Sequence, residues 1–253
     1  MKLKFLGVGS AFTTPSYYHS NAILTASNGK KLLLDCGSDI RFSLAEAGVT
    51  PAEIDAVYLS HQHADHIGGM EFLAYTTFFN PHNARPKLFI EETLADEVWD
   101  ASLKGGLSIV DDQPRGISDF FEPRLQQLGT PFTWEGIQLT LYKMPHVMTQ
   151  VGDLFSYGLL IEQPGRAPVF FSSDATFAPE ILLNLPKNTG LIFHDCETAT
   201  IPTGVHCHYN ELCQLPPELK AKLWLYHYQP NPPFQPTDDG FLGFVQKGQE
   251  FEL

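Results

Sequence analysis

The sequence His61-Gln62-His63-Ala64-Asp65-His66 follows directly after the apolar run at residues 56–60. That run predicts a β-strand, and residues two apart on an extended segment project to the same side, so His61 and His63 can converge on one ion. Asp65 and His66 then turn toward a second position as a helix begins. Three imidazoles and a carboxylate within six residues are poor material for a core unless something charged binds them. The stretch therefore predicts a metal site rather than a solvated polar turn.

Three further residues of metal-binding type end later apolar runs of the sequence. They are His146, Asp174 and His227. Each one alone is more typical of a cap or of a satisfied polar group than of a ligand. Together they supply the carboxylate bridge and the additional imidazoles that a site for two metal ions needs.

Composition sets the class of protein. The 253 residues carry 16 Lys and Arg against 29 Asp and Glu, a formal net charge of −13, with 43% hydrophobic and 18% charged residues. These values exclude a disordered, collagen-like or coiled-coil chain. The acidity argues against binding of long nucleic acids, which depends on clustered Lys and Arg. No apolar run has the length of a membrane span and the start is not a secretory leader, so we expect a cytoplasmic protein without membrane contact.

The order of apolar runs and turn signals predicts one α/β domain over residues 1–253. The cysteines, Cys36, Cys196, Cys207 and Cys213, form no CxxC pair and are expected to be free thiols. Predicted strands lie at residues 2–7, 21–26, 31–35, 55–60, 87–90, 133–143, 156–162, 168–172, 191–194 and 223–227. Predicted helices lie at residues 39–47, 65–79, 92–104 and 210–222.

With these residues in place, the chain resembles the metallo-β-lactamase superfamily, whose signature is HxHxDH followed by a distant His, a bridging Asp and a final His. The resemblance runs from Phe5-Leu6-Gly7-Val8-Gly9-Ser10 to Tyr226-His227. It implies a four-layered αββα sandwich with the site at the sheet edges. It also implies that His61, His63 and His146 hold one metal, that Asp65, His66 and His227 hold the other, and that Asp174 bridges the two.

An all-imidazole and carboxylate shell suits Zn²⁺ first and Mn²⁺ as the alternative. Iron-dependent flavodiiron relatives usually carry an acidic residue at the position of His63, so reduction of O₂ or NO is not expected. Two divalent ions can share a water molecule and lower its pKa toward neutrality. The expected reaction is hydrolysis by a metal-bridged hydroxide, with Asp65 as the orienting base.

Within the superfamily, the sequence is most similar to the ribonuclease Z branch. His194-Asp195-Cys196-Glu197-Thr198 stands where that branch has a His-Glu-Ala-Thr segment, and His206-Cys207-His208 stands where it has His-Ser-Thr. The resemblance implies that Asp195 orients His206 and that His206 protonates the leaving group. The chain departs from the branch by Asp for Glu and by Cys207-His208 for Ser-Thr. His208 is therefore a competing candidate for the leaving-group acid.

The expected substrate is a small phosphodiester. Ribonuclease Z proteins generally carry a long basic arm after the Ser-Tyr-Gly segment, whereas here only a hairpin fits between Gly158 and Val169. The compact members of the branch include cyclic-nucleotide phosphodiesterases, some of them phage-encoded enzymes that destroy cyclic-nucleotide immune signals. A cyclic nucleotide is therefore the expected substrate, and members of the branch are commonly homodimers, so a homodimer is expected too.

Four alternatives remain open. The first is a thioesterase of the glyoxalase II kind, although no basic cluster for glutathione is evident. A tRNA 3′-processing endonuclease is the second. The third is the phosphonate-pathway cyclic phosphodiesterase, which normally has an extra cysteine-rich zinc site near its N-terminus, whereas no cysteine precedes Cys36 here. The fourth is a protein that binds a nucleotide without turnover.

Several polar residues outside the motif also receive interpretations. Asp35 follows a buried strand and is expected to accept the second ring N–H of a ligating histidine. The pair Ser38-Asp39 is expected to cap the helix after it. His194 is read as a buried histidine rather than a ligand, and His19 and His82 are given no role.

Overall fold

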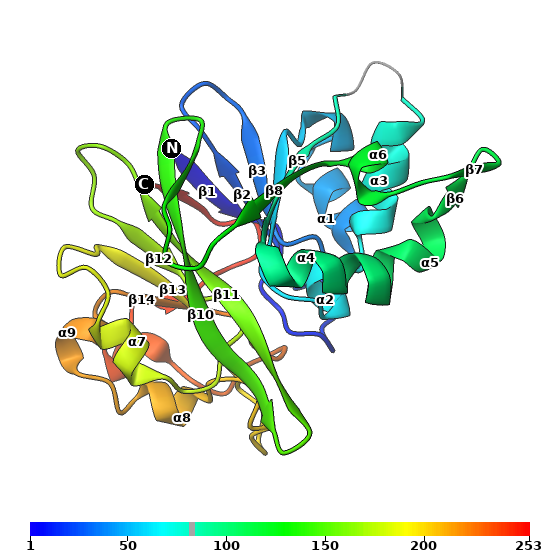
Figure 1. Cartoon of the computed structure of the whole chain (residues 1–253). Helices are drawn as coiled ribbons and strands as arrows, with labels where there is room; N and C mark the ends of the chain where they lie inside the picture. Colours follow the sequence, from blue (N-terminus) through cyan, green and yellow to red (C-terminus); the bar gives the residue numbers. More distant parts are fainter. Residues whose placement is uncertain (81–83) are drawn as a thin grey trace. The chain divides into compact units, whose positions relative to one another are not determined.

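The computed structural model describes residues 1–80 and 84–253, so His82 lies outside the described residues (Figure 1). The chain forms two compact units, each assembled from separate stretches. Unit 1 comprises Met1–Gly7, Tyr18–Gln127 and Gly248–Glu252, and unit 2 comprises Val8–Tyr17, Leu128–Lys247 and Leu253. The single domain over residues 1–253 stays a prediction.

Unit 1 contains a seven-stranded sheet. Strands β16, β1, β2 and β3 pair antiparallel, and β3, β4, β5 and β8 pair parallel. All four residues of β4 are buried, as expected for an inner parallel strand, and its carboxyl end leads into His61. In sheet order the strands are β16 (Glu250–Glu252), β1 (Lys2–Phe5), β2 (Ala22–Thr25), β3 (Lys31–Leu34), β4 (Ala56–Leu59), β5 (Lys87–Glu91) and β8 (Glu122–Gln126).

Helices flank this sheet, and Figure 1 shows α1 and α3 on one face of it. A two-stranded sheet of β6 (Ile109–Val110) and β7 (Gln113–Pro114) adds to the unit. The helices are α1 (Ile40–Glu46), the 3₁₀ turn η1 (Pro51–Glu53), α2 (Ala64–Ile67), α3 (Met70–Phe78), α4 (Glu92–Val98), the π-helical η2 (Trp99–Leu103), α5 (Lys104–Leu107) and α6 (Ile117–Phe120).

The helix predicted at residues 65–79 is wrong in one respect, because it breaks at Gly68 and Gly69 into α2 and α3. A Cβ atom on Gly69 would lie 2.3 Å from Cγ2 of Ile40 and 2.4 Å from the carbonyl oxygen of Gly37. The chain passes so close to the loop before α1 that only glycine fits. This packing ends α2 directly after the histidine motif.

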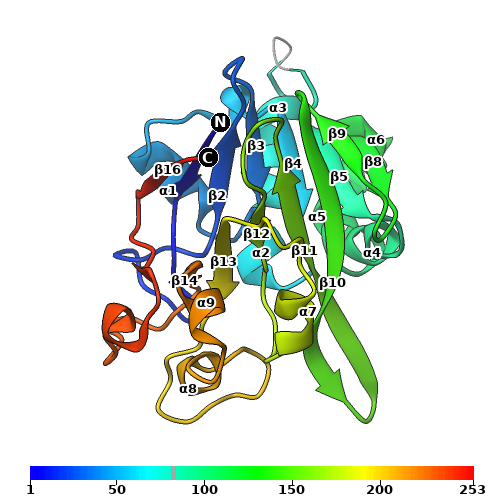
Figure 2. The same cartoon turned by 90° about the vertical axis from the view of Figure 1, so that its left-hand side faces the viewer.

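Unit 2 contains the second seven-stranded sheet. Strands β12, β13, β14 and β15 pair parallel, and β9 to β12 pair antiparallel. The β10–β11 hairpin is longer than predicted and β9 is a separate strand (Figure 2). In sheet order the strands are β15 (Gly243–Phe244), β14 (Leu223–Tyr226), β13 (Leu191–Asp195), β12 (Val169–Phe171), β11 (Gly152–Glu162), β10 (Ile137–Thr149) and β9 (Phe132–Trp134).

Short helices lie on one face of this second sheet, as Figure 2 shows for α7, α8 and α9. The helix predicted at residues 210–222 is interrupted because Pro216 and Pro217 have no backbone N–H to continue it. The helices are α7 (Pro179–Leu183), α8 (Tyr209–Leu212), α9 (Pro217–Lys220) and the 3₁₀ turn η3 (Pro236–Asp239). Both units thus pair a sheet with helices, which confirms the predicted α/β class.

The cysteines are free, as predicted. Cys196 and Cys207 belong to the buried core of unit 2, and burial raises the pKa of both thiols well above the ordinary value, so they stay protonated. None of the helices in the described part of the chain has the length and apolarity that a membrane span requires.

Candidate metal centre

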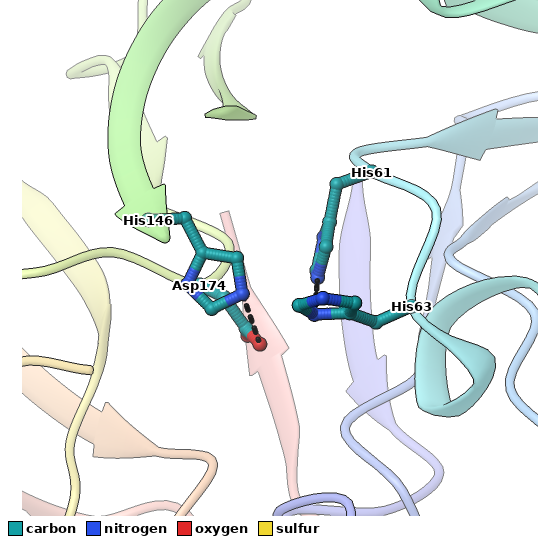
Figure 3. Close-up of side chains that lie close together, drawn as sticks. All are labelled: His61, His63, His146 and Asp174. Carbon is teal, nitrogen blue, oxygen red and sulfur yellow. Dashed lines mark hydrogen bonds and ion pairs between the residues drawn. The ribbon is translucent and has the colours of Figure 1, made fainter. Parts of the chain in front are cut away.

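The first ligand set lies in unit 1, on the loop between β4 and α2. Nε2 of His61 and Nδ1 of His63 face each other at 3.2 Å (Figure 3). The hydroxyl of Ser60 donates to Oδ2 of Asp35 at 2.8 Å, so the 3.0 Å contact between Ser60 Oγ and Nδ1 of His61 has the histidine as donor. His61 therefore carries its proton on Nδ1, and Nε2 is its acceptor nitrogen.

Asp35 also orients the second histidine of this set, as expected from its position after a buried strand. Nδ1 of His66 donates to Oδ2 of Asp35 at 2.8 Å, and both side chains are 1% exposed. The acceptor nitrogen Nε2 of His66 then lies 3.4 Å from Oδ2 of Asp65, which is buried as well. One carboxylate thus fixes the ring of His66 directly and that of His61 through Ser60.

The second ligand set lies in unit 2 and centres on Asp174. Nε2 of His227 is 3.4 Å from Oδ2 of Asp174. Nε2 of His146 is 3.9 Å from the same oxygen, as the dashed line between His146 and Asp174 in Figure 3 marks. Nδ1 of His146 donates to the carbonyl oxygen of Val205 at 2.7 Å. Nδ1 of His227 lies 3.4 Å from Oδ1 of Asp195. Each histidine again presents Nε2 as an acceptor.

These contacts fit divalent metal ions. A nitrogen lone pair that faces a carboxylate oxygen repels it unless a cation lies between them, and this arrangement occurs at His66, His146 and His227. Metal–ligand bonds of about 2.1 Å at the tetrahedral angle place two ligand atoms roughly 3.4 Å apart. The separations of 3.2 and 3.4 Å within the two sets agree with that spacing.

A histidine and aspartate pair adjoins Asp174 in unit 2. Nδ1 of His206 donates to Oδ2 of Asp195 at 2.9 Å and lies 3.8 Å from Oδ2 of Asp174. Burial alone would lower the pKa of His206, but the charge and hydrogen bond of Asp195 outweigh it and raise this pKa. Burial likewise would raise the pKa of Asp195, but His206 and His227 hold it well below its ordinary value. The pair is a carboxylate that accepts the Nδ1 proton of His206 and favours the protonated form of that ring.

The competing histidine of the sequence is engaged elsewhere. Nε2 of His208 donates to the carbonyl oxygen of Ala199 at 3.0 Å, and its Nδ1 accepts the N–H of Asn210 at 3.2 Å. Both ring nitrogens of His208 are therefore engaged in hydrogen bonds with backbone groups. His194 is buried and donates from Nδ1 to the carbonyl oxygen of Asp195, in keeping with its interpretation as a buried histidine.

Strained backbone accompanies both sets. Of the eight non-glycine residues with positive φ in the described part of the chain, three lie here: Asp35, Ser173 and His227, with φ values of 59°, 57° and 64°. Left-handed conformations are uncommon for residues other than glycine, although Asp and His adopt them more often than most, and they persist where the surrounding structure enforces them. Two of the three residues orient or supply a predicted ligand, and the third precedes Asp174.

The structure thus brings together His61, His63, Asp65 and His66 in unit 1, and His146, Asp174, Asp195, His206 and His227 in unit 2. Sequence reasoning missed Ser60 and the carbonyl group of Val205, which orient His61 and His146. Ser60 stands directly before the motif, so its position in the sequence could have predicted a contact with His61. A carbonyl group leaves no signal in a sequence.

Solved structures show the same fold over the whole chain. The metallo-β-lactamase fold protein YhfI from Bacillus subtilis matches with a TM-score of 0.74 at 20% identity, covering 99% of this chain and 98% of that chain. A diphosphatase from the PhnP family matches with a TM-score of 0.77 at 18% identity, covering 100% and 97%. The short form of human tRNase Z matches with a TM-score of 0.69 at 17% identity, covering 100% and 99%. The predicted fold class is confirmed: the chain is a protein of the metallo-β-lactamase fold whose histidine and aspartate sets could hold divalent metal ions.

The family follows from sequence comparison. The model of the family "Anti-Pycsar protein Apyc1" matches residues 1–251. The chain is 33% identical over 259 residues to the anti-Pycsar protein Apyc1 of Bacillus phage BSP38, covering 100% of this chain and 98% of that protein. It is also 33% identical over 255 residues to the protein of that name from Paenibacillus harenae, covering 100% of both. The chain belongs to the anti-Pycsar protein Apyc1 family.

Proposed function

We propose that this protein is a phosphodiesterase with two divalent metal ions that hydrolyses a cyclic nucleotide. Membership of the Apyc1 family supports this proposal, together with the resemblance to compact cyclic-nucleotide phosphodiesterases. The observation that carries it is the 2.9 Å hydrogen bond between His206 and Asp195, next to Asp174.

That pair suits a leaving group that needs a proton. Because Nδ1 of His206 donates to Asp195, Nε2 is the nitrogen that can give a proton to the departing oxygen as its bond to phosphorus breaks. An alkoxide is far more basic than the thiolate released from a thioester, whose conjugate acid has a pKa of about 8.5. A thioesterase would therefore have much less use for the pair.

The attacking water, by contrast, must lose a proton. In the proposed mechanism, the carboxylate of Asp65 accepts a proton from the water as its oxygen attacks phosphorus. When bound, divalent ions stabilise the negative charge that develops on the phosphoryl oxygens. The residues proposed to hold them, as Zn²⁺ or alternatively Mn²⁺, are His61, His63, Asp65, His66, His146, Asp174 and His227.

The connection between β11 and β12 supports a small substrate. It comprises residues 163–168 and joins two antiparallel strands, so the segment after Gly158 is a simple hairpin, as predicted. This connection therefore holds no inserted arm, and a chain with a net charge of −13 has no excess of cations for gripping a transfer RNA. A cyclic nucleotide needs neither.

The test is a substrate panel for the protein loaded with Zn²⁺ or Mn²⁺. The panel holds 3′,5′- and 2′,3′-cyclic nucleotides, bis(p-nitrophenyl) phosphate, a precursor tRNA and a glutathione thioester, with products followed by chromatography. Cleavage of a cyclic nucleotide, abolished in a folded Asp65→Ala variant, is the expected result. Cleavage of the thioester or the tRNA alone would move the assignment to those activities, and no turnover would indicate a binding protein.

We also propose a homodimer, on the resemblance to the ribonuclease Z branch alone. Sedimentation equilibrium of the purified protein measures it directly. The chain mass is 28.2 kDa, and a species of that mass at micromolar concentration would contradict the proposal.

A further inference from the structure

Glu197 is a buried carboxylate that the proposed mechanism does not use. It is 1% exposed, and both of its oxygens accept the backbone N–H of Thr203, at 2.9 and 3.2 Å. No lysine or arginine of residues 1–80 and 84–253 forms an ion pair with it. Burying a charged group is costly unless it is paired or hydrogen-bonded. A carboxylate buried without a cationic partner within these described ranges indicates that the protein needs the hydrogen bond that this side chain accepts from Thr203.

The bond to Thr203 closes a loop. Residues 198–205 connect Glu197 to His206, and the backbone of Glu197 is tied to the far end of this connection. Its N–H donates to the carbonyl oxygen of Cys207 at 2.8 Å, and its carbonyl oxygen accepts the N–H of Tyr209 at 2.9 Å. The backbone of Glu197 therefore holds the segment after His206, and its side chain holds the middle of the loop at Thr203.

Other bonds fix the two ends of the same loop. At the start, the hydroxyl of Thr198 exchanges hydrogen bonds with Gln229, at 2.9 and 3.0 Å. At the end, the carbonyl oxygen of Val205 accepts the proton of His146 at 2.7 Å. Among the described residues, Glu197 supplies the side-chain anchor at Thr203, three positions before His206.

We propose that Glu197 is a positioning residue that sets the place of the His206 ring by holding the loop at Thr203. This inference rests on the proposed function, in which His206 protonates the leaving oxygen. A general acid must approach the atom that it protonates to within ~3 Å, and a displacement of about 1 Å can cost about 100-fold in rate. The role depends on the reach of the side chain rather than on its charge.

Three substitutions distinguish the effect of the length of the Glu197 side chain from the effect of its charge. Glu197→Gln keeps the length and one acceptor oxygen, Glu197→Asp keeps the charge but is one methylene too short to reach Thr203, and Glu197→Ala removes both. We expect Glu197→Gln to stay within about 3-fold of the wild type, and Glu197→Asp and Glu197→Ala to lose about 30-fold on an alkyl-leaving substrate.

The diagnostic readout compares two leaving groups. The p-nitrophenolate of bis(p-nitrophenyl) phosphate hardly needs a proton, so Glu197→Ala is expected to change its kcat by less than about 3-fold. His206→Ala should produce the same selective loss, and adding Glu197→Ala to it should cause little further loss, because both changes remove one function. Glu91→Gln in unit 1 is the matched control, since this buried glutamate also accepts backbone N–H groups, from Thr93 and Leu94.

Hydrogen exchange of the metal-free protein gives a second readout without catalysis. Glu197→Ala and Glu197→Asp should accelerate exchange at the Thr203 amide, while Glu197→Gln and Glu91→Gln should leave it protected. Three results would overturn the inference: an equal loss of kcat on both leaving groups, a higher kcat for Glu197→Asp than for Glu197→Gln, or an unchanged rate of hydrogen exchange at the Thr203 amide in Glu197→Ala. A wild type that cleaves no phosphodiester would instead refute the proposed function, and exchange would still decide whether Glu197 anchors the loop.

Discussion

At the scale of single residues, each oriented histidine of the ligand sets gives the proton of Nδ1 to a specific acceptor. In unit 1 the acceptors are Ser60 Oγ and Asp35, and in unit 2 they include the carbonyl group of Val205. Such partners fix the tautomer of a ligating histidine and raise its basicity. Asp35 orients His66 by a direct hydrogen bond and His61 through Ser60. Among residues that are not ligands themselves, its loss should therefore weaken metal binding most.

We predict that Asp35→Asn weakens metal binding by about 10- to 100-fold, the usual effect of losing such a partner. Asparagine tolerates the φ of 59° at this position, so the backbone should not be the cause. Competition with a chromophoric chelator measures the Zn²⁺ affinity. Asp55→Asn is the control, since Asp55 accepts the N–H of Lys31 and touches no predicted ligand. Equal affinities for the two variants would contradict the role of Asp35.

Sequence reasoning at this scale succeeded where the partner follows from a strand end and was wrong where the partner is remote. Asp35 was predicted to accept from a histidine, and it does. Asp39 was predicted to cap α1, and it does stand at the N-cap position, but its side chain makes no cap bond and instead accepts the N–H of His19 at 2.8 Å. The choice between His206 and His208 also depends on which ring nitrogens the folded backbone engages, which no spacing reveals.

At the scale of elements, the motif is held by a close approach between the loop before α1 and the helix α2. A Cβ atom on Gly37 would lie 2.1 Å from the carbonyl oxygen of Asp65. The motif itself identifies the strand and the histidines, but this approach has no periodic pattern. That is why the sequence predicted one helix over residues 65–79 instead of α2 and α3.

We predict that Gly37→Ala destabilises the metal-free protein by about 2–4 kcal/mol, because the new methyl group overlaps backbone that cannot yield easily. It should also weaken metal binding, since the displaced backbone carries Asp65. Urea unfolding measures the stability. Gly105→Ala in α5 is the control, as a Cβ atom there meets nothing within 4 Å, and it should be neutral or stabilising by up to about 1 kcal/mol. Equal effects would show that the close approach is unimportant.

Strand β13 carries a pH-sensitive group. Burial lowers the pKa of His194 below its ordinary value of 6.5, against a smaller opposing influence of Asp195. The unfolded chain therefore takes up a proton that the folded chain refuses, and stability present above pH 6.5 is lost as the pH falls toward the lowered pKa. We predict that the free energy of unfolding falls more steeply between pH 7.5 and 5.5 in the wild type than in His194→Gln. Parallel pH profiles would refute this assignment.

At the scale of the whole molecule, the motif and its order along the chain were sufficient to predict the fold, and a weak two-half pattern could be seen in the sequence, but the assembly of each unit from separate stretches of the chain was not predicted. The two ends show why. Strand β16 pairs with β1 in the register Lys2 to Glu252, supported by an ion pair of 2.8 Å between those side chains. A pairing between the first and last residues of the chain has no local signal, since neither turn chemistry nor periodicity spans that separation.

The last prediction concerns the metal ions and the stability of the whole protein. The ligand sets bury aspartates in a chain whose net charge is already −13, and cations that bind only the folded state offset this repulsion. Binding at 100 times Kd stabilises by about 2.7 kcal/mol, which corresponds to roughly 5–10 °C in Tm for a chain of this size. We therefore expect a chelator to lower Tm by that amount, and Zn²⁺ or Mn²⁺ to restore it. The shift should vanish in a His63→Ala, His227→Ala double variant, which lacks one ligand of each set. Identical melting of stripped and loaded wild type would show that these residues hold no metal in the folded protein.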